Sequence, residues 1–238
     1  MTEPLYRYDS HLSTCEARVT GINERGGILL DRTIFFATGD DQPGDTGELE
    51  RSDGSHIAIG TTVFSDDKSE ITHVPGEEGG SLPEIGEIVV AHIDWPRRYR
   101  HMRMHTALHT ICAAIQTKTT GAQIGAEERR IDLNMQDPPD RNAVHDATMK
   151  AIDADLAVTS EWITDEELDA NPDLIKSMSV SPPRGSGLVR LVRIGDTFDL
   201  QPCGGTHVKS TLEIGPVTIT KIEKKGRLNR RIRIRLDE

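Results

Sequence analysis

The 238-residue sequence predicts an α+β protein in which a small N-terminal β-barrel precedes a two-layer α+β domain. Short apolar runs separated by Gly, Pro and Asp clusters fill the first part of the chain, a pattern typical of a small barrel or sandwich. Helical and strand-like patterns are mixed along the remainder, which favours an α+β domain. We therefore expect a barrel domain at residues 1–92 and an α+β domain at residues 93–238.

The barrel domain is expected to contain five short strands. Each apolar or β-branched run is bounded by turn-forming residues, and the runs cover residues 16–22, 28–36, 57–64, 71–74 and 85–93. Residues 38–47 are rich in Gly, Asp and Pro and are expected to form a loop. Because aromatic residues make up only 4% of the chain, the cores must be built from Ile, Val, Leu and Ala.

The α+β domain is expected to begin with a helix at residues 97–118, entered at Pro96 and followed by a loop at Gly121 and Gly125. Its apolar residues recur at spacings of three or four and predict one buried face: Met104, Leu108, Ile111 and Ile115. Further helices are expected at residues 142–156, with Ala143, Ala147 and Ala151 on one face, and at 165–174. Strands are expected at 130–134, 157–163 and 188–194, a loop at Pro182-Pro183, and a final hairpin of 216–224 and 230–236 with Gly226 in its turn.

Composition limits the class of protein. No run approaches the roughly 20 apolar residues of a membrane-spanning helix. The N-terminus lacks a basic region followed by an apolar one, and three widely separated cysteines do not suggest disulfides. We therefore expect a cytoplasmic protein without a membrane partner. The 39 acidic residues against 28 basic ones also suggest a salt-rich cytoplasm, in which repulsion between carboxylates is screened.

Basic residues gather locally although the net charge is −11. Residues 221–235 contain eight Lys and Arg residues and one acidic residue, Glu223, and residues 97–103 contain four Arg. A basic band on an acidic chain is typical of local phosphate binding, although a solvated basic strand would show the same pattern.

Two short motifs supply nitrogen and sulfur ligands for a metal. His105 and His109 are four residues apart within the expected helix, so both project from one face. Cys203 and His207 are held four residues apart by Gly204-Gly205, which allows a tight loop. Together the four residues form the set that tetrahedral Zn²⁺ prefers.

Other His and Cys residues are interpreted differently. His101 lies one turn before His105, too far along the axis to share an ion with His109. Cys112 could replace Cys203 as the thiolate, but its apolar neighbours favour packing, and Cys15 is also interpreted as a packing residue.

These motifs resemble the editing domain of alanyl-tRNA synthetases and the free-standing alanyl-tRNA editing proteins, the AlaX family. The resemblance continues through Asp94-Trp95, Arg130-Ile131-Asp132 and Asn229-Arg230-Arg231, and through Leu30-Asp31-Arg32-Thr33 and residues 42–47 near the N-terminus. It covers nearly the whole chain. Because the sequence holds no adenylate-forming region, it resembles the medium-length, stand-alone type with an accessory barrel, whose editing needs no ATP.

The chain departs from the family pattern at one point. Gly39-Asp40-Asp41-Gln42 stands where the family usually has Gly-Gly-Gly-Gln. Glycine permits positive φ and a close backbone approach, so we expect the two Asp to remove that freedom and to add negative charge near a tRNA end.

The resemblance implies a zinc-dependent hydrolase that deacylates mischarged seryl-tRNA(Ala), and glycyl-tRNA(Ala) as a second substrate, for the fidelity of translation. Zinc would be held by His105, His109, Cys203 and His207. Thr106 and Gln123, the latter in the loop after the metal helix, are candidates for reading the serine hydroxyl or placing the water. The phosphates of the acceptor end would be bound by Lys224, Lys225, Arg227, Arg230 and Arg231. A monomer or a weak dimer is expected.

Three alternatives stay open. A threonyl-tRNA editing domain, acting on seryl-tRNA(Thr), shares the paired motifs, but Gly204-Gly205-Thr206 favours the alanyl branch. A non-catalytic, zinc-stabilised tRNA-binding module would account for four protein ligands, which are typical of structural zinc. A zinc hydrolase for small esters or peptides is disfavoured because no Glu lies beside the metal histidines.

Overall fold

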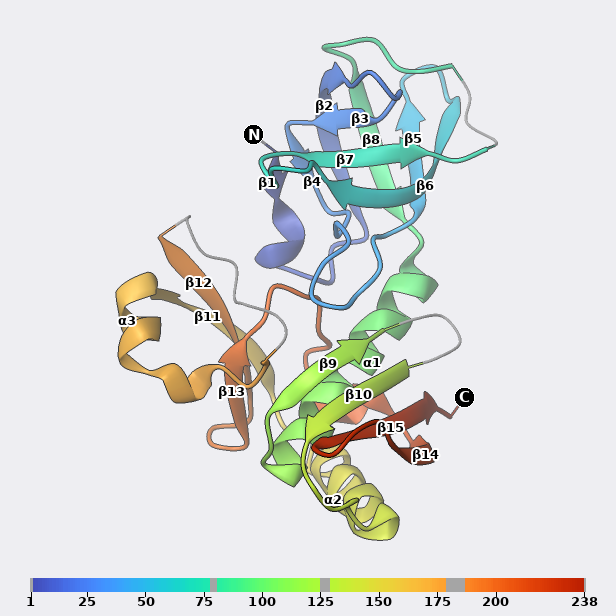
Figure 1. Cartoon of the computed structure of the whole chain (residues 1–238). Coiled ribbons are helices and arrows are strands. Elements are labelled where there is room, and N and C mark those ends of the chain that lie inside the picture. The colour runs from blue at the N-terminus through green and yellow to red at the C-terminus, as the bar shows by residue number, and fades with distance from the viewer. Residues whose placement is uncertain (1, 78–80, 125–128, 179–186, 238) are drawn as a thin grey trace. The chain divides into compact units, whose positions relative to one another are not determined.

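The computed structural model describes residues 2–77, 81–124, 129–178 and 187–237 (Figure 1). The chain divides into two compact units, Met1–Arg100 and His101–Glu238, so the division falls within helix α1 (Trp95–Ile115). The domain boundary expected between residues 92 and 93 stays a prediction. The features expected at Gly125 and at Pro182-Pro183 lie outside the described residues.

Six antiparallel strands close a barrel in the first unit, as predicted (Figure 1). Strand by strand around the barrel they are β2 (Thr14–Ile22), β3 (Ile28–Leu30), β7 (Ile71–Pro75), β6 (His56–Phe64), β5 (Gly47–Arg51) and β8 (Ile88–Ile93), and β8 pairs back onto β2. Alternate residues point inward because successive side chains of a strand face opposite sides. The core they form is almost entirely aliphatic, with Ile28, Leu30, Leu49, Ile57 and Val89 fully buried.

Two parts of the barrel differ from the expectation. The predicted strand at residues 28–36 is divided into β3 and the short β4 (Arg32–Thr33), which pairs in parallel with β1 (Glu3–Pro4) ahead of the 3-10 turn η1 (Leu5–Arg7). Strand β5 was not predicted at all. Leu49 is its only apolar residue, and its pairing to β6 and β8 supplies the order that its own sequence does not indicate.

The segment at Gly39–Gln42 forms a tight turn that corrects the expectation for its two acidic residues. Gly39 N donates to Gln42 O at 3.1 Å, and Gln42 N donates to Gly39 O at 2.8 Å. Between them Asp40 and Asp41 have φ of 47° and 59°. Two consecutive positive φ angles define the two-residue type I′ turn. Asp therefore adopts the left-handed backbone that the family glycines allow, and Asp tolerates this region better than most residues.

Helix α1 begins with a buried ion pair in the first unit. Asp94 Oδ1 accepts from Arg97 N at 3.1 Å and caps the helix, so it starts before the predicted residue 97. Arg98 is fully buried, and its Nε lies 2.9 Å from Asp45 Oδ2. Its remaining N–H groups donate to Asp45 and to the carbonyls of Ser10 and Ile34. The first turn of α1 is thus fixed to the barrel by hydrogen bonds that satisfy a buried charge.

The second unit is an α+β structure with two antiparallel sheets (Figure 1). One sheet has the order β14 (Val217–Lys224), β15 (Asn229–Leu236), β10 (Arg129–Asn134) and β9 (Thr119–Gln123). The other is formed by β11 (Val158–Thr164), β12 (Leu188–Ile194) and β13 (Asp199–Pro202). The remaining elements are α2 (Arg141–Asp153), α3 (Asp165–Ala170) and the 3-10 turns η2 (Pro172–Leu174) and η3 (Thr211–Ile214).

Most predicted elements of this unit are present, including the β14–β15 hairpin with Gly226 in its turn. Strands β9 and β13 were not predicted, and Gly121 lies within β9 rather than in a loop. The helix predicted at 165–174 ends at Ala170, because Pro172 starts the separate turn η2.

The buried faces of the helices also differ from the pattern. In α2 the buried residues are Val144, Thr148, Ala151 and Ile152, so the predicted alanine face is wrong except at Ala151. Larger apolar side chains remove more surface from water and therefore turn inward. Helix α1 is buried around its whole circumference from His101 to Cys112, apart from half-buried Arg103. No helix in the described ranges is long and apolar enough to cross a membrane.

Candidate metal centre

Helix α1 presents His105 and His109 on one side, one turn apart. Their ring centroids lie 5.1 Å from each other, and both side chains are buried. The i, i+4 spacing produces this arrangement, as the sequence predicts.

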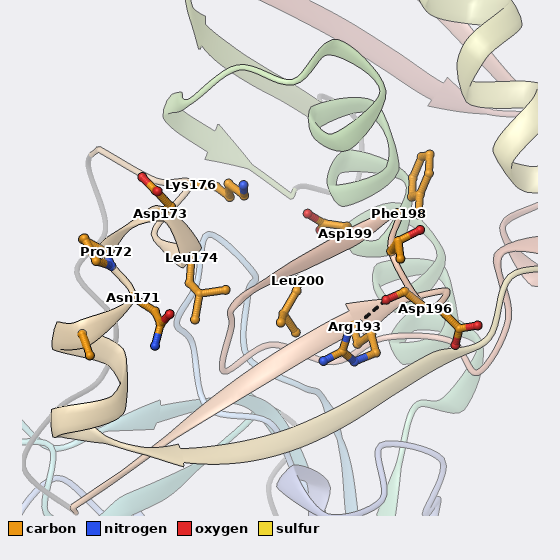
Figure 2. Close-up of a pocket in the computed structure, with 12 residues that line it drawn as sticks. Asn171, Pro172, Asp173, Leu174, Lys176, Arg193, Asp196, Phe198, Asp199 and Leu200 are labelled. Atoms are coloured by element: carbon orange, nitrogen blue, oxygen red, sulfur yellow. Dashed lines mark hydrogen bonds between the residues drawn. The ribbon is translucent and has the colours of Figure 1, made fainter.

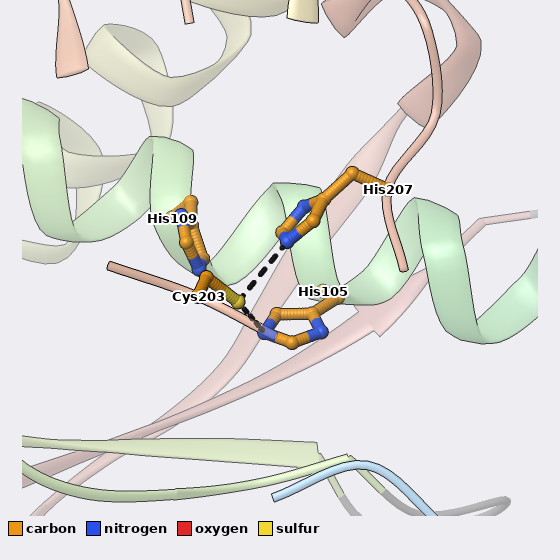
Figure 3. A group of neighbouring side chains, drawn as sticks. All are labelled: His105, His109, Cys203 and His207. Atoms are coloured by element: carbon orange, nitrogen blue, oxygen red, sulfur yellow. Dashed lines mark hydrogen bonds between the residues drawn. The ribbon is translucent and has the colours of Figure 1, made fainter. Parts of the chain in front are cut away.

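The loop that follows β13 places Cys203 and His207 opposite these histidines (Figure 3). The His207 ring centroid lies 4.4 Å from that of His105 and 4.6 Å from that of His109. Cys203 Sγ lies 3.5 Å from His105 Nε2 and 3.3 Å from His207 Nε2. One nitrogen or sulfur atom from each of the four residues lies within 4.8 Å of all the others.

This donor set fits a tetrahedral metal ion. Ligand atoms at about 2.0–2.3 Å from zinc are separated from one another by about 3.3–3.8 Å, and the sulfur–nitrogen distances above fall in that range. A thiolate and three imidazoles suit zinc and other borderline-soft ions better than Mg²⁺ or Ca²⁺. The four residues could therefore hold a metal ion.

The Cys203–His207 loop is held in shape by hydrogen bonds that the sequence analysis did not foresee. Arg190 Nη1, from β12, donates to Cys203 O at 2.9 Å and to Gly205 O at 3.0 Å. Gly205 N donates to Cys203 Sγ at 3.4 Å and fixes the position of the sulfur. The loop therefore keeps the sulfur directed at the histidines.

Two of the histidines contact a further side chain through their second ring nitrogen. Thr106 Oγ1 lies 3.1 Å from His207 Nδ1, and the same oxygen donates to Met102 O at 2.9 Å. Because its single proton is used by Met102, Thr106 accepts from His207 Nδ1–H, which leaves the lone pair of His207 on Nε2. His109 Nδ1 lies 3.6 Å from Asp199 Oδ2.

Burial sets the protonation of the cluster. It lowers the pKa of His105 and His207 well below the ordinary value, and the neighbouring imidazoles and Arg190 lower these pKa values further. Both rings are therefore neutral at pH 7 and available as ligands. Burial also lowers the pKa of His109, but hydrogen bonding to Asp199 and Cys203 outweighs it and raises that pKa to about 10. A metal ion must displace this proton.

The remaining predicted residues are not among the four clustered side chains. Gln123 is the exposed last residue of β9, not a loop residue, and its Oε1 accepts from Arg130 Nε at 3.1 Å. Cys112 is buried, and its Sγ donates to Thr117 O at 3.3 Å. Burial raises the pKa of the Cys112 thiol to about 12, consistent with packing. Cys15 packs against the barrel core, also as a packing residue.

The basic residues expected to bind phosphate differ in exposure. Lys224, Lys225 and Arg227 are exposed on the β14–β15 hairpin, with Lys225 Nζ 3.5 Å from a carboxylate oxygen of Glu223. Arg230 is buried and donates to backbone carbonyls. Arg231 forms a two-bond ion pair with Asp132 at 2.7 and 2.9 Å, so its charge is already matched.

Asp199 also lines two open cavities, of about 430 and 400 Å³. Figure 2 shows the first, with Asp199 between Phe198 and Leu200 on the strand that leads to Cys203. Both cavities are lined as well by Asp173, Lys176 and Phe198. Asp199 and Arg190 were missed from the sequence. The sequence signal for Asp199 was its spacing, because Asp199, Gln201 and Cys203 alternate along a strand and therefore share one face.

Comparison with known proteins identifies the family. Residues 189–233 match the domain described as "Threonyl and Alanyl tRNA synthetase second additional domain". The chain is 36% identical to the alanyl-tRNA editing protein AlaX-M of Methanosarcina mazei, over 98% of this chain and 95% of the relative. It is 34% identical to AlaX-M of Saccharolobus solfataricus, over 98% of each. The alanine–tRNA ligase of Pyrobaculum arsenaticum is 33% identical over 94% of this chain but only 25% of the ligase. The chain therefore belongs to the family of alanyl-tRNA editing proteins.

Proposed function

We propose that the chain is a stand-alone, ATP-independent hydrolase that uses zinc to remove serine, and glycine as a second substrate, from mischarged tRNA(Ala). The observation that supports this most directly is the approach of four ligand atoms from His105, His109, Cys203 and His207 to within 4.8 Å of one another. The names of the relatives agree with editing of alanyl-tRNA rather than of seryl-tRNA(Thr).

The need for such an enzyme follows from the limits of binding selectivity. A small alanine pocket rejects serine poorly, since an added hydroxyl changes binding by only a few kcal/mol, about 100-fold. A second site that hydrogen-bonds the hydroxyl discriminates far better, because the correct alanyl group would leave its polar groups without partners.

Zinc bound by the four residues would supply a Lewis acid beside the ester carbonyl. The protein's own residues orient the ligands and exclude bulk water. Thr106 accepts from His207 Nδ1, and this contact supports the proposal that Thr106 acts at the site, where it would read the serine hydroxyl or place the water. Gln123 carries its amide at the exposed end of β9 and is proposed to read the serine hydroxyl or to place the water. Phosphate contacts are proposed for the exposed Lys224, Lys225 and Arg227, with Arg230 and Arg231 as members of the same basic hairpin.

A non-catalytic tRNA-binding module is the second candidate. Four protein ligands complete a tetrahedral site, and sites without an open position are typical of structural zinc. In that case the metal would stabilise the Cys203–His207 loop without turning over an ester.

The test offers seryl-, glycyl- and alanyl-tRNA(Ala) and seryl-tRNA(Thr) to the protein with and without a chelator. We expect serine release from seryl-tRNA(Ala) that falls to the buffer rate with the chelator and in the Cys203→Ser variant. Cys112→Ser is the matched control, because Cys112 is a buried cysteine on α1 outside the ligand set. Metal-dependent binding of tRNA(Ala) without release of any amino acid would instead establish the module.

A further inference from the structure

The strand that leads into the metal loop carries a buried carboxylate on its inner face. Along β13, Asp199 and Gln201 are buried while Leu200 and Pro202 are half-buried. Successive side chains of a strand point to opposite faces, so Cys203, the next residue in the alternation, continues the side of Asp199. The same short segment therefore places Cys203 Sγ in the four-residue cluster and the Asp199 carboxylate beside it.

The carboxylate of Asp199 faces one ring nitrogen of one ligand. His109 Nδ1 lies 3.6 Å from Asp199 Oδ2, which is the distance of an ion pair and slightly long for a hydrogen bond. Gln201 Nε2 donates to the same Oδ2 at 2.7 Å and fixes the carboxylate. His109 Nδ1 is buried, and its contact with Asp199 is longer than a normal hydrogen bond. A proton on Nδ1 would face the Asp199 carboxylate, which leaves the lone pair on Nε2 for a metal ion in the cluster.

A carboxylate beside His109 would balance the net charge of a metal ion bound by the four residues. A divalent ion held by one thiolate and three neutral imidazoles keeps one uncompensated positive charge, and a buried net charge is costly. Asp199 is buried within ion-pair distance of His109 and would compensate this charge.

We propose that Asp199, held by Gln201, is a positioning residue for His109 that fixes its ring and tautomer and raises the affinity of the centre for zinc. The inference rests on the metal centre of the proposed function but not on ester hydrolysis. The competing interpretation is that the Asp199–Gln201 bond only fastens β13. That structural role requires a hydrogen-bond acceptor at residue 199 but no charge.

Asp199→Asn separates the two roles, because asparagine keeps the shape and an acceptor oxygen but removes the charge. We expect the zinc affinity, measured by competition with a chromophoric chelator, to fall about 10- to 100-fold. With Co²⁺ as the probe, we expect changed ligand-field bands in the visible spectrum. The thermal unfolding midpoint of the metal-free protein should stay near that of the wild type. Asp196→Asn is the matched control, since it removes the same charge from an exposed position of the same hairpin.

Zinc affinity and a Co²⁺ spectrum equal to the wild type in Asp199→Asn would overturn the proposal. Should the metal-free Asp199→Asn protein fail to fold, Gln201→Met keeps the Asp199 carboxylate and removes the hydrogen bond that fixes it. A several-fold loss of zinc affinity is then expected, and unchanged affinity would refute the role. Serine release by the wild type is measured in parallel. If the wild type binds zinc and shows the Asp199 dependence but releases no serine, the hydrolase proposal fails and this inference stands.

Discussion

At the scale of single residues, His73 in the barrel wall is the clearest case of a side chain restricted to one protonation state. His73 Nδ1 lies 3.0 Å from Ile28 O, so this nitrogen carries the proton. Thr33 Oγ1 lies 2.7 Å from Nε2 and donates to it, while accepting from Phe35 N at 3.0 Å. Every polar atom in this buried chain of hydrogen bonds is satisfied only when the imidazole is neutral.

The barrel should therefore lose stability in mild acid. Burial lowers the pKa of His73 from 6.5 to about 4, against a smaller opposite effect of the bond to Ile28. The unfolded chain takes up the proton near pH 6.5, so stability is complete above that pH and declines as pH falls toward 4. The loss from this one group is about 3 kcal/mol. Urea unfolding at pH 7.5, 5.5 and 4.5 should show a weaker pH dependence in His73→Gln than in the wild type. His56→Gln, at an exposed barrel histidine, should leave the slope unchanged. Equal slopes in all three proteins would contradict the assignment.

The sequence predicted the four residues that lie together and could hold a metal ion, but not the residues that hold them in place. Helical spacing and a Gly-Gly loop are local patterns, so the pairs 105/109 and 203/207 could be read from the chain itself. The contact of Arg190 with Cys203 depends on how β12 pairs with β13. The contact of Asp199 with His109 joins β13 to helix α1, 90 residues earlier in the chain, and no local spacing encodes it.

At the scale of elements, the start of α1 depends on one buried ion pair. Asp45 is buried, accepts from Phe36 N at 2.7 Å and binds the Arg98 guanidinium. Removing one partner of such a pair leaves an uncompensated charge away from water. Asp45→Asn should therefore lower the free energy of unfolding by about 3–5 kcal/mol in urea titrations.

The control for this variant is Glu48→Gln, which breaks a contact between the exposed side chains of Glu48 and His56 in the same barrel. Exposed pairs contribute at most about 1 kcal/mol, so this change should be small. Comparable decreases in the free energy of unfolding in the two variants would show that burial does not determine how much the Asp45–Arg98 pair contributes to stability.

Elements with strong apolar periodicity were predicted well, and short polar ones were not. Strands β5, β9 and β13 have few apolar residues, and each is ordered by pairing with a neighbouring strand: β5 with β6 and β8, β9 with β10, and β13 with β12. The turn at Asp40 and Asp41 shows the opposite error. Because glycine adopts positive φ most easily, the sequence suggested that two Asp would change the backbone there. The turn is nevertheless formed, with Gly39 paired to Gln42 and both Asp at positive φ.

At the scale of the whole molecule, charge is distributed unevenly over an acidic chain. The net charge is −11, yet the C-terminal hairpin carries exposed cations at Lys224, Lys225 and Arg227. Composition alone predicted this basic segment but not which of its members face solvent. Arg230 is buried, and Arg231 and Arg233 are paired with Asp132 and Glu223.

Binding of tRNA should depend on salt through the exposed members. In Lys224→Ala/Arg227→Ala, the slope of log affinity against log salt concentration should decrease by about 1–2, because each lost phosphate contact removes about 0.7–0.9. Fluorescence anisotropy with labelled tRNA(Ala) between 50 and 300 mM KCl would measure it. Arg25→Ala/Lys68→Ala, which removes two exposed cations from the barrel, should keep the wild-type slope. A decrease of equal size in both double variants would indicate a general effect of net charge instead of a docking surface.

The order of the ligands along the chain has a consequence for synthesis on the ribosome. The barrel can close once β8 has emerged, because its final pairing joins β8 to β2. His105 and His109 emerge soon afterwards, whereas Cys203 arrives only after both β12 and β13 have been translated. Since nascent chains fold from the N-terminus onward, an ion held by all four residues could be bound only by a nearly finished polypeptide. A chain truncated between residues 110 and 200 would contain the barrel strands and two of the four clustered residues, His105 and His109.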